Sequence, residues 1–194
     1  GSNLNTVFIR VADSHNHHRV QEMTLSGGFV RHIGVGQVQH PRCVCVHKPL
    51  DALYVTEYGA NRVSVFRLSD LSAAPRQFSL PSGSYPWHAC VTPPLRDGRA
   101  RLAVACCTSH CVMLVPISDD GGLQVDKAVR VGDGQLKHPR GVTALPDGTL
   151  AVGDTHNHRC CIFDIRTAHQ GPDSVKLVRT IGTGTAGSGK GQFK

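Results

Sequence analysis

The sequence predicts an all-β fold, a β-propeller of four-stranded antiparallel blades, and the main observation behind this prediction is an internal repeat. The stretch Asp154–Phe163 (DTHNHRCCIF) resembles Asp13–Met23 (DSHNHHRVQEM), and weaker copies begin at Glu57 and Cys106. The two strong copies each lie between short apolar runs, which is the pattern of a β-hairpin.

A second marker repeats with a similar spacing and supports the same fold. Proline follows His or Tyr at His40–Pro41, Tyr85–Pro86 and His138–Pro139. Repeats of about 40 to 50 residues with several short strands each are typical of propellers. The sequence therefore predicts about four blades, at roughly 3–39 (partial), 40–84, 85–137 and 138–194.

The strands can be placed in order from the apolar runs and the turn residues between them. The first unit has three predicted strands, at 3–12, 19–23 and 28–33. The second has four, at 42–46, 52–56, 62–68 and 76–80. The third has strands at 89–92, 102–105, 111–117 and 124–131, with a Pro- and Gly-containing loop at 93–99. The fourth has strands at 141–145, 149–153, 160–165 and 177–181.

Both ends of this array are open, because the first unit lacks its innermost strand and the tail stops before the next one. We expect the chain to be part of a longer, six-bladed ring, with self-association through the open blade edges. Two alternatives are an edge-to-edge assembly of two copies and a tight closed ring of four blades. Gly1-Ser2 is interpreted as the scar of a cleaved tag.

Composition narrows the class of protein. Hydrophobic residues make up 40% of the 194 residues and aromatic residues 5%, which suits many short strands. No apolar run approaches the roughly 18 to 20 residues that span a bilayer, so we expect no membrane contact. The eight cysteines lie mainly in apolar strands and are interpreted as reduced thiols of a cytoplasmic protein. The 21 basic and 14 acidic residues give a net charge of +7, which favours anionic partners.

The fourth unit carries a family resemblance. HPRGVTALPDGTLAVGDTHNHRCCIFD, followed by GKGQF, resembles an NHL repeat. The resemblance implies a propeller, usually of six blades, that serves as a binding platform, although some related propellers are lyases or lactonases. The third unit departs from the pattern, because Cys106 and Cys111 stand where the acid and the arginine are expected.

One face of the disc is predicted to be positively charged. In such a unit the hairpin between the second and third strands lies at the same end as the link to the next unit. These loops supply the candidate binding residues His17, His18, Arg19, Arg42, Tyr58, Arg62, Trp87, His88, Lys137, His138, Arg140, His156, His158 and Arg159. Arginine and histidine can contact phosphates or stack on unpaired bases, which would make this face an anion-binding platform. The alternative is that these residues are solvated or paired with each other.

Three functions follow from this face. The first is a non-enzymatic scaffold that binds protein partners, and the alternative is an RNA-binding platform. A propeller lyase or lactonase is the third. The repeated pairs of Asp13 with Arg19, Glu57 with Arg62 and Asp154 with Arg159 are interpreted as structural, since a catalytic site needs one asymmetric constellation. No catalytic residue, metal ligand or cofactor is predicted.

Overall fold

The structure is a computed structural model that describes residues 7–193. The tag scar predicted at residues 1–2 and the start of the first predicted strand lie outside the described residues. Within 7–193 the regular elements are fifteen β-strands and five short 3-10 turns, so the predicted all-β fold is confirmed.

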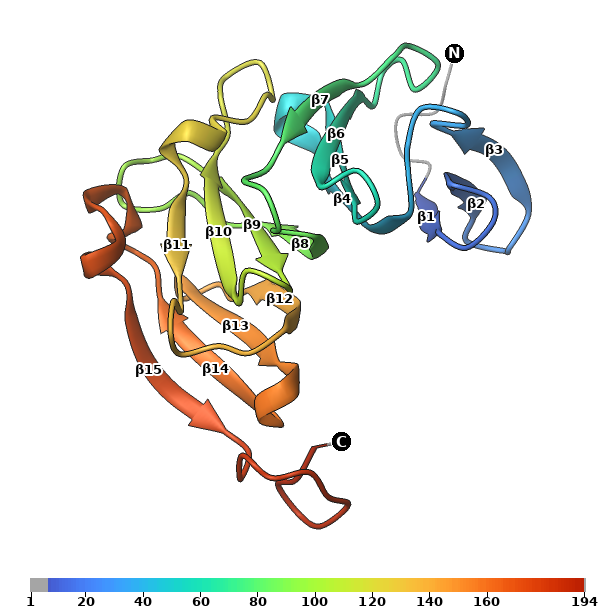
Figure 1. Ribbon diagram of the computed structural model, residues 1–194. Coiled ribbons are helices and arrows are strands. Elements are labelled where there is room, and N and C mark those ends of the chain that lie inside the picture. The colour runs from blue at the N-terminus through green and yellow to red at the C-terminus, as the bar shows by residue number, and fades with distance from the viewer. Residues whose placement is uncertain (1–6, 194) are drawn as a thin grey trace.

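The strands form four antiparallel sheets that follow one another along the chain, here called blades 1 to 4 (Figure 1). Blade 1 contains β1 (Phe8–Asp13), β2 (Arg19–Thr24) and β3 (Phe29–Ile33). Blade 2 contains β4 (Pro41–His47), β5 (Ala52–Glu57), β6 (Arg62–Arg67) and β7 (Arg76–Ser79). Blade 3 contains β8 (Pro86–Val91), β9 (Arg101–Cys106), β10 (Cys111–Pro116) and β11 (Val129–Val131). Blade 4 contains β12 (Pro139–Ala144), β13 (Thr149–Asp154), β14 (Arg159–Asp164) and β15 (Lys176–Ile181).

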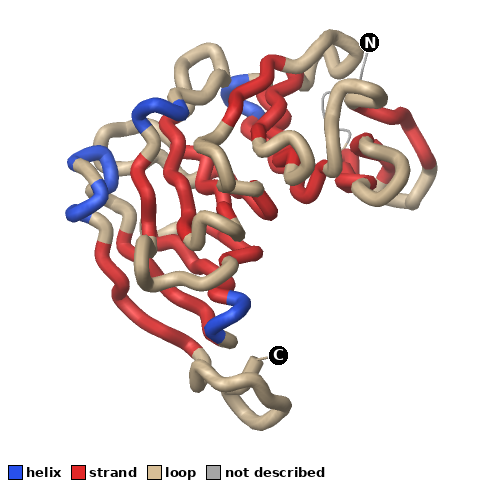
Figure 2. Tube along the Cα trace, viewed as in Figure 1, coloured by secondary structure: helices blue, strands red, loops and turns tan. Residues whose placement is uncertain are grey.

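The blades lie along an open arc, with blade 1 at one end and β15 at the other (Figures 1 and 2). The innermost strands β4, β8 and β12 are neighbours, as expected for strands that converge on a propeller axis. The closed four-bladed ring considered from the sequence is not the arrangement seen.

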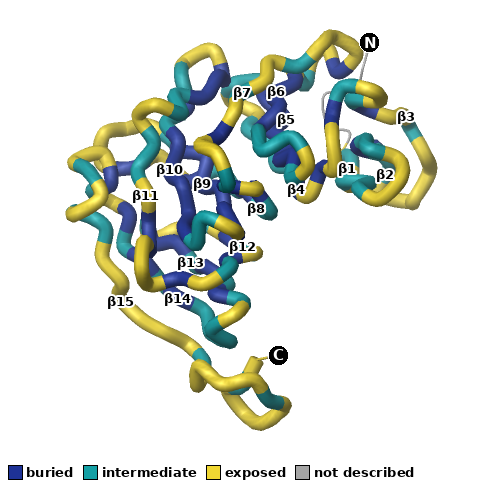
Figure 3. The backbone as a smooth tube through the Cα atoms, viewed as in Figure 1, coloured by how far each residue is buried: buried dark blue, intermediate teal, exposed yellow. Residues whose placement is uncertain are grey.

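The core consists of three apolar clusters, one at each junction between neighbouring blades. In Figure 3 the middle strands β5, β6, β9 and β10 are mostly buried. Phe66 of blade 2 packs with Val20 and Ile33 of blade 1. Phe163 of blade 4 packs in the cluster that also holds Val112 and Leu114 of blade 3. Burial between blades therefore holds the array together.

One predicted strand is shorter than expected. The sequence predicts a strand over 124–131, whereas β11 covers only Val129–Val131 and follows a 3-10 turn at Val125–Lys127. Its partner β10 ends at Pro116, which has no amide hydrogen to continue the ladder. The chain instead closes a turn in which Gln124 donates its N–H to the Pro116 carbonyl.

Tyr54 anchors the loop of the next blade from inside blade 2. Its buried hydroxyl donates to the Gly121 carbonyl over 3.0 Å. Tyr54→Phe leaves that carbonyl without its donor and is expected to lower the free energy of unfolding by about 1 kcal/mol. Urea unfolding checks this, with the exposed Tyr85→Phe as the control. Equal midpoints for the two variants would contradict the anchoring role.

Candidate functional site

The loops at one end of the blades share an unusual backbone conformation. The hairpins β1–β2, β5–β6, β9–β10 and β13–β14 each end in a residue with positive φ: His18 (46°), Asn61 (50°), His110 (55°) and His158 (48°). The residue before the proline of each inter-blade link does too: His40 (46°), Tyr85 (48°) and His138 (48°). This left-handed conformation lets the chain turn sharply where two blades meet.

These two sets of residues contact each other at every junction between described blades. The N–H of His40 donates to Nδ1 of His18 over 2.9 Å, and the N–H of His138 donates to Nδ1 of His110 over 3.1 Å. At the middle junction the N–H of Tyr85 donates to Oδ1 of Asn61 over 2.7 Å. We call this contact the blade-junction hydrogen bond.

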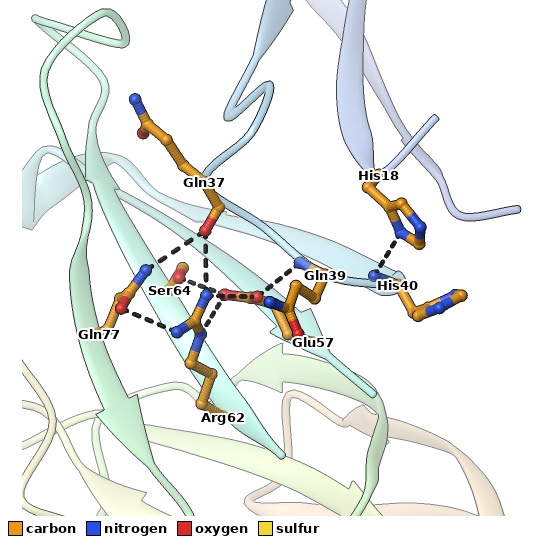
Figure 4. A network of polar contacts seen from close by, with 8 residues as sticks. All are labelled: His18, Gln37, Gln39, His40, Glu57, Arg62, Ser64 and Gln77. Atoms are coloured by element: carbon orange, nitrogen blue, oxygen red, sulfur yellow. Dashed lines mark hydrogen bonds and ion pairs between the residues drawn. The ribbon is translucent and has the colours of Figure 1, made fainter. Parts of the chain in front are cut away.

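In blades 2 and 4 a buried acid ties the preceding inter-blade link to the blade. In blade 2, Glu57 is fully buried and accepts two hydrogen bonds from Arg62, each of 2.9 Å (Figure 4). Glu57 also accepts from the N–H of Gln39 over 2.7 Å and from the Ser64 hydroxyl. Arg62 reaches the Gln37 carbonyl over 3.0 Å. Glu57 and Arg62 therefore hold the link at two points, Gln39 and Gln37. We call this acid–arginine pair the lock.

The same lock recurs in blade 4 and, in a simpler form, in blade 1. Asp154 is buried and accepts from Arg159 over 2.7 Å and from the N–H of Lys137 over 2.6 Å. Arg159 donates to the Gln135 carbonyl over 2.6 Å. In blade 1, Asp13 accepts from Arg19 over 3.0 Å. Burial alone would raise the pKa of Asp13, but hydrogen bonds from Arg19 and its neighbours hold that pKa below its usual value.

Blade 3 replaces the lock with a pair of thiols. Cys106 and Cys111 face each other across the hairpin, at the register positions that Glu57 and Arg62 occupy in blade 2. Both are free and buried. The pKa of Cys106 is raised, first by its contact with Cys111 and then by burial. The lock is therefore not required at every blade.

Two arginines on this face pair with no acid among the described residues. Arg42 and Arg140 are exposed, and neither forms an ion pair within residues 7–193. Their guanidinium carbons lie 4.4 Å and 4.5 Å from the centre of the Trp87 ring. Trp87 is on β8, and the two arginines are on the flanking strands β4 and β12. Both arginines are thereby held in place by cation–π contacts.

Tyrosines extend this group toward blade 2. Arg42 also lies 5.3 Å from the Tyr58 ring, and Tyr58 lies 5.1 Å from the ring of Tyr85. We call Tyr58, Arg42, Trp87 and Arg140 the Arg–Trp ladder. It spans blades 2 to 4. Its two guanidinium groups face solvent on the side of the molecule formed by the hairpins and inter-blade links, which we call the loop face.

Several histidines of the face contact one another through edge-to-face or tilted rings. His138 lies 4.5 Å from His110 and 4.2 Å from His156, and His40 lies 4.1 Å from His18, between ring centres. Desolvation, followed by repulsion from these neighbours and from nearby arginines, lowers the pKa of His40 and of His138. Lowering the pH therefore adds less positive charge to this face than the number of its histidines suggests.

The remaining predicted residues have local roles. His17 lies 3.1 Å from Asp13, and the side chain of Lys137 is exposed. Burial lowers the pKa of His88. The structure thus brings Arg42, Tyr58, Trp87 and Arg140 together. In contrast, Arg19, Arg62 and Arg159 form ion pairs with the acids of their own hairpins.

The sequence did not single out Asn61 and His110 as junction residues. Their common position, immediately before the arginine of each hairpin or its Cys111 replacement, was the available signal. Their function is set by backbone conformation, which a one-sequence pattern does not reveal.

The inner strands bring three cysteines together near the axis. Burial raises the pKa of Cys43, of Cys45 and of Cys90, the last to about 11. Such thiols are poor nucleophiles at neutral pH and suit packing where the strands converge. Among the described residues, no group of three or more His, Cys, Asp or Glu side chains is placed to hold a metal ion. No helix within 7–193 is long and apolar enough to cross a membrane.

Comparison with solved structures shows the same fold in several propellers. The chain matches a putative 6-phosphogluconolactonase from Bacteroides uniformis at 14% identity and a TM-score of 0.68, over 95% of this chain and 56% of that one. It matches streptogramin B lyase at 15% identity and a TM-score of 0.62, over 91% and 56%. A chain of the nidogen/laminin complex matches at 15% and 0.63, over 89% and 58%. The chain thus spans slightly more than half the length of these structures.

The fold and the loop-face site define a β-propeller protein. Within it, residues 136–163 match the NHL repeat, which confirms the resemblance drawn from the sequence. A 58-residue stretch is 41% identical to the RING finger protein nhl-1 of Caenorhabditis elegans, covering 30% of this chain and 5% of that protein. The chain therefore carries an NHL repeat within a β-propeller.

Proposed function

We propose that this protein is a non-enzymatic scaffold that binds an acidic segment of a protein partner on its loop face. The observation that carries the proposal is the Arg–Trp ladder. Arg42 and Arg140 are exposed and unpaired with carboxylates within 7–193, whereas Arg19, Arg62 and Arg159 are committed to buried or half-buried acids. The free arginines can bind carboxylates without breaking an internal ion pair.

The position of Trp87 favours specific binding over general charge attraction. A guanidinium that rests near an aromatic ring loses little additional freedom when it binds a carboxylate through two parallel hydrogen bonds. Two such groups on either side of one ring present a pair of prearranged anion sites. Acidic side chains spaced along an extended peptide fit this chemistry.

RNA is the second candidate, favoured by the Tyr58–Tyr85 pair beside the arginines. Unpaired bases stack on exposed aromatic rings, and phosphates bind arginine. However, Trp87, the largest aromatic ring of the face, already contacts two guanidinium groups. Bases would therefore have to stack on the tyrosine rings. This arrangement favours carboxylate binding.

The chain has one tryptophan, so its fluorescence reports on the ladder directly. Titration with a glutamate-rich peptide is expected to change Trp87 emission, while a single-stranded RNA of matched charge binds more weakly. Arg42→Ala or Arg140→Ala should each weaken peptide binding by about tenfold, because a hydrogen bond to a charged group is lost.

Arg96→Ala is the matched control, because Arg96 is exposed in the β8–β9 loop at the other end of the blade and carries the same charge. An equal loss for Arg96→Ala would show attraction by net charge alone and contradict the proposal. Tighter binding of the RNA than of the peptide, with a steep decline as salt rises, would support the second candidate instead.

Enzyme activity is the third candidate, because the solved propellers with this fold include one named as a lyase and one named as a putative lactonase. Assays of lyase and lactonase substrates with added divalent ions test it. Turnover that is abolished by a substitution on the loop face would replace the scaffold proposal.

A further inference from the structure

Trp87 has a fixed place between the two exposed arginines of the loop face. Its ring meets the ring of Tyr58 edge-on, with 5.7 Å between the ring centres and an angle of 85° between the ring planes. Arg42 reaches Trp87 from β4 and Arg140 reaches it from β12, the two strands that neighbour β8. The ring therefore stands between the two guanidinium groups, and one carboxylate does not bind both of them.

The width of the ring determines how far apart two bound carboxylates lie. The guanidinium carbons are 4.4 Å and 4.5 Å from the ring centre, so their separation cannot exceed twice that distance. In an extended peptide, residues two apart point to the same face and are separated by roughly 6.6 Å. Adjacent residues point to opposite faces, and residues four apart are separated by roughly 13 Å. The alternate spacing is the one that matches the two arginines.

The Arg42 end of the ladder also offers apolar surface. The Tyr58 ring lies 5.3 Å from the Arg42 guanidinium carbon and 5.1 Å from the ring of Tyr85. Tyr85 is 37% exposed. An apolar side chain can therefore rest on the two tyrosines beside a carboxylate bound to Arg42. This surface lies at one end of the pair of arginines and not between them.

The nearest imidazoles do not add a competing charge at neutral pH. Desolvation, together with repulsion from neighbouring imidazoles and from Arg42, lowers the pKa of His40. The same causes, with Arg140 as the nearby arginine, lower the pKa of His138. Both rings are therefore largely neutral at pH 7, and the charge next to Trp87 comes from the two guanidinium groups.

We propose that the Arg–Trp ladder recognises an extended peptide in which one apolar and two acidic residues occupy alternate positions, with the apolar residue at one end of the acid pair. The acid nearer the apolar residue binds Arg42, and the other acid binds Arg140. The apolar side chain packs on Tyr58 and Tyr85. This inference rests on the function proposed above, because it specifies the ligand of the same site.

A set of tryptophan-free peptides of identical composition tests the spacing. Each contains one leucine, two glutamates and a constant number of serines and glycines, with the glutamates one, two or four residues apart. The two-apart peptide is expected to bind about tenfold more tightly than the others, because each of the others engages one arginine only. Trp87 emission follows the titration, and calorimetry gives a readout that does not depend on the ring.

Substitutions assign each acid to its arginine. With Arg140→Ala, the two-apart peptide should bind no more tightly than the one-apart peptide. Replacing the glutamate farther from leucine by glutamine should weaken binding to the unchanged protein by about tenfold, and should have little effect once Arg140 is removed. The nearer glutamate should show the same coupling with Arg42→Ala. The exposed Arg96→Ala is the control and should keep the preference for the two-apart peptide.

Tyr85→Asn tests the apolar position. Tyr85 has a φ of 48°, and asparagine tolerates this left-handed conformation. The variant should lose the advantage of a leucine peptide over the same peptide with serine in that place, while it keeps the preference for the two-apart glutamates.

Two results would overturn the inference, and they differ in what they leave standing. Equal binding of the three spacings, weakened in each case by Arg42→Ala and by Arg140→Ala, would reject the spacing and leave acid binding in place. Absence of binding by every glutamate peptide would reject both the spacing and the function proposed above.

Discussion

Glu57→Ala is expected to lower the free energy of unfolding by about 3–5 kcal/mol, because it leaves a half-buried guanidinium without its counter-charge. Arg62 would retain only its contacts to Gln77 and to the Gln37 carbonyl. The N–H of Gln39 and the hydroxyl of Ser64 would also lose their acceptor. Urea unfolding followed by circular dichroism measures the loss.

Blade 3 supplies the comparison that makes this result interpretable. The double variant Glu57→Cys with Arg62→Cys copies the Cys106 and Cys111 pair at the same register positions. Removing both charges should recover a substantial part of the stability lost in Glu57→Ala, as expected when an ion pair is replaced as a whole. Asp119→Ala, at an exposed acid, is the control and should change stability by less than about 0.5 kcal/mol. A small effect of Glu57→Ala would show that the lock contributes little.

Acidification below about pH 6.5 is expected to destabilise the fold. Burial lowers the pKa of His47 and of His88, and desolvation and neighbouring positive charges lower the pKa of His40 and of His138. In the unfolded chain these histidines titrate near 6.5, so the unfolded state binds more protons than the folded state. Stability is therefore complete above that pH and is lost as the pH falls toward the folded-state pKa values.

The tyrosine at the middle junction provides the matched variant. Tyr85 occupies the position of His40 and His138, so a phenol stands there in place of an imidazole. The double variant His40→Tyr with His138→Tyr should reduce the slope of urea midpoint against pH between 7 and 5. The exposed His169→Tyr should leave the slope as it is. A flat profile for the unchanged protein, or an unaltered slope in the double variant, would contradict the role of these histidines.

The sequence was sufficient for the fold because the relevant signals are local and repeated. Hairpin residues such as Asp154 and Arg159 recur in three blades, and each recurrence strengthened the assignment of strands on both sides. The interpretation of these pairs as structural agrees with their geometry. The strand at 124–131 was too long because Pro116, on the partner strand, ends the pairing, and partner strands are not visible in a single run of residues.

The candidate site was harder to predict, since its members come from different blades. Arg42 and Arg140 are separated along the chain, and their shared position after a His-Pro pair does not reveal that both contact the same tryptophan. The distinction lies in what each side chain meets after folding: an acid across a hairpin in one case, a neighbouring blade's tryptophan in the other. Contacts of this kind depend on how blades converge, which periodicity does not specify.

The inter-blade links into blades 2 and 4 are each held by both neighbouring blades, and this has a consequence for how the molecule opens. The link into blade 2 is held by His18 of blade 1 and by Glu57 of blade 2, so releasing it requires both neighbours to yield. The terminal units have a neighbour on one side alone within the described residues. Opening should therefore begin at the two ends and move inward, with blades 2 and 3 exchanging their amide hydrogens last, as in a row of coupled segments.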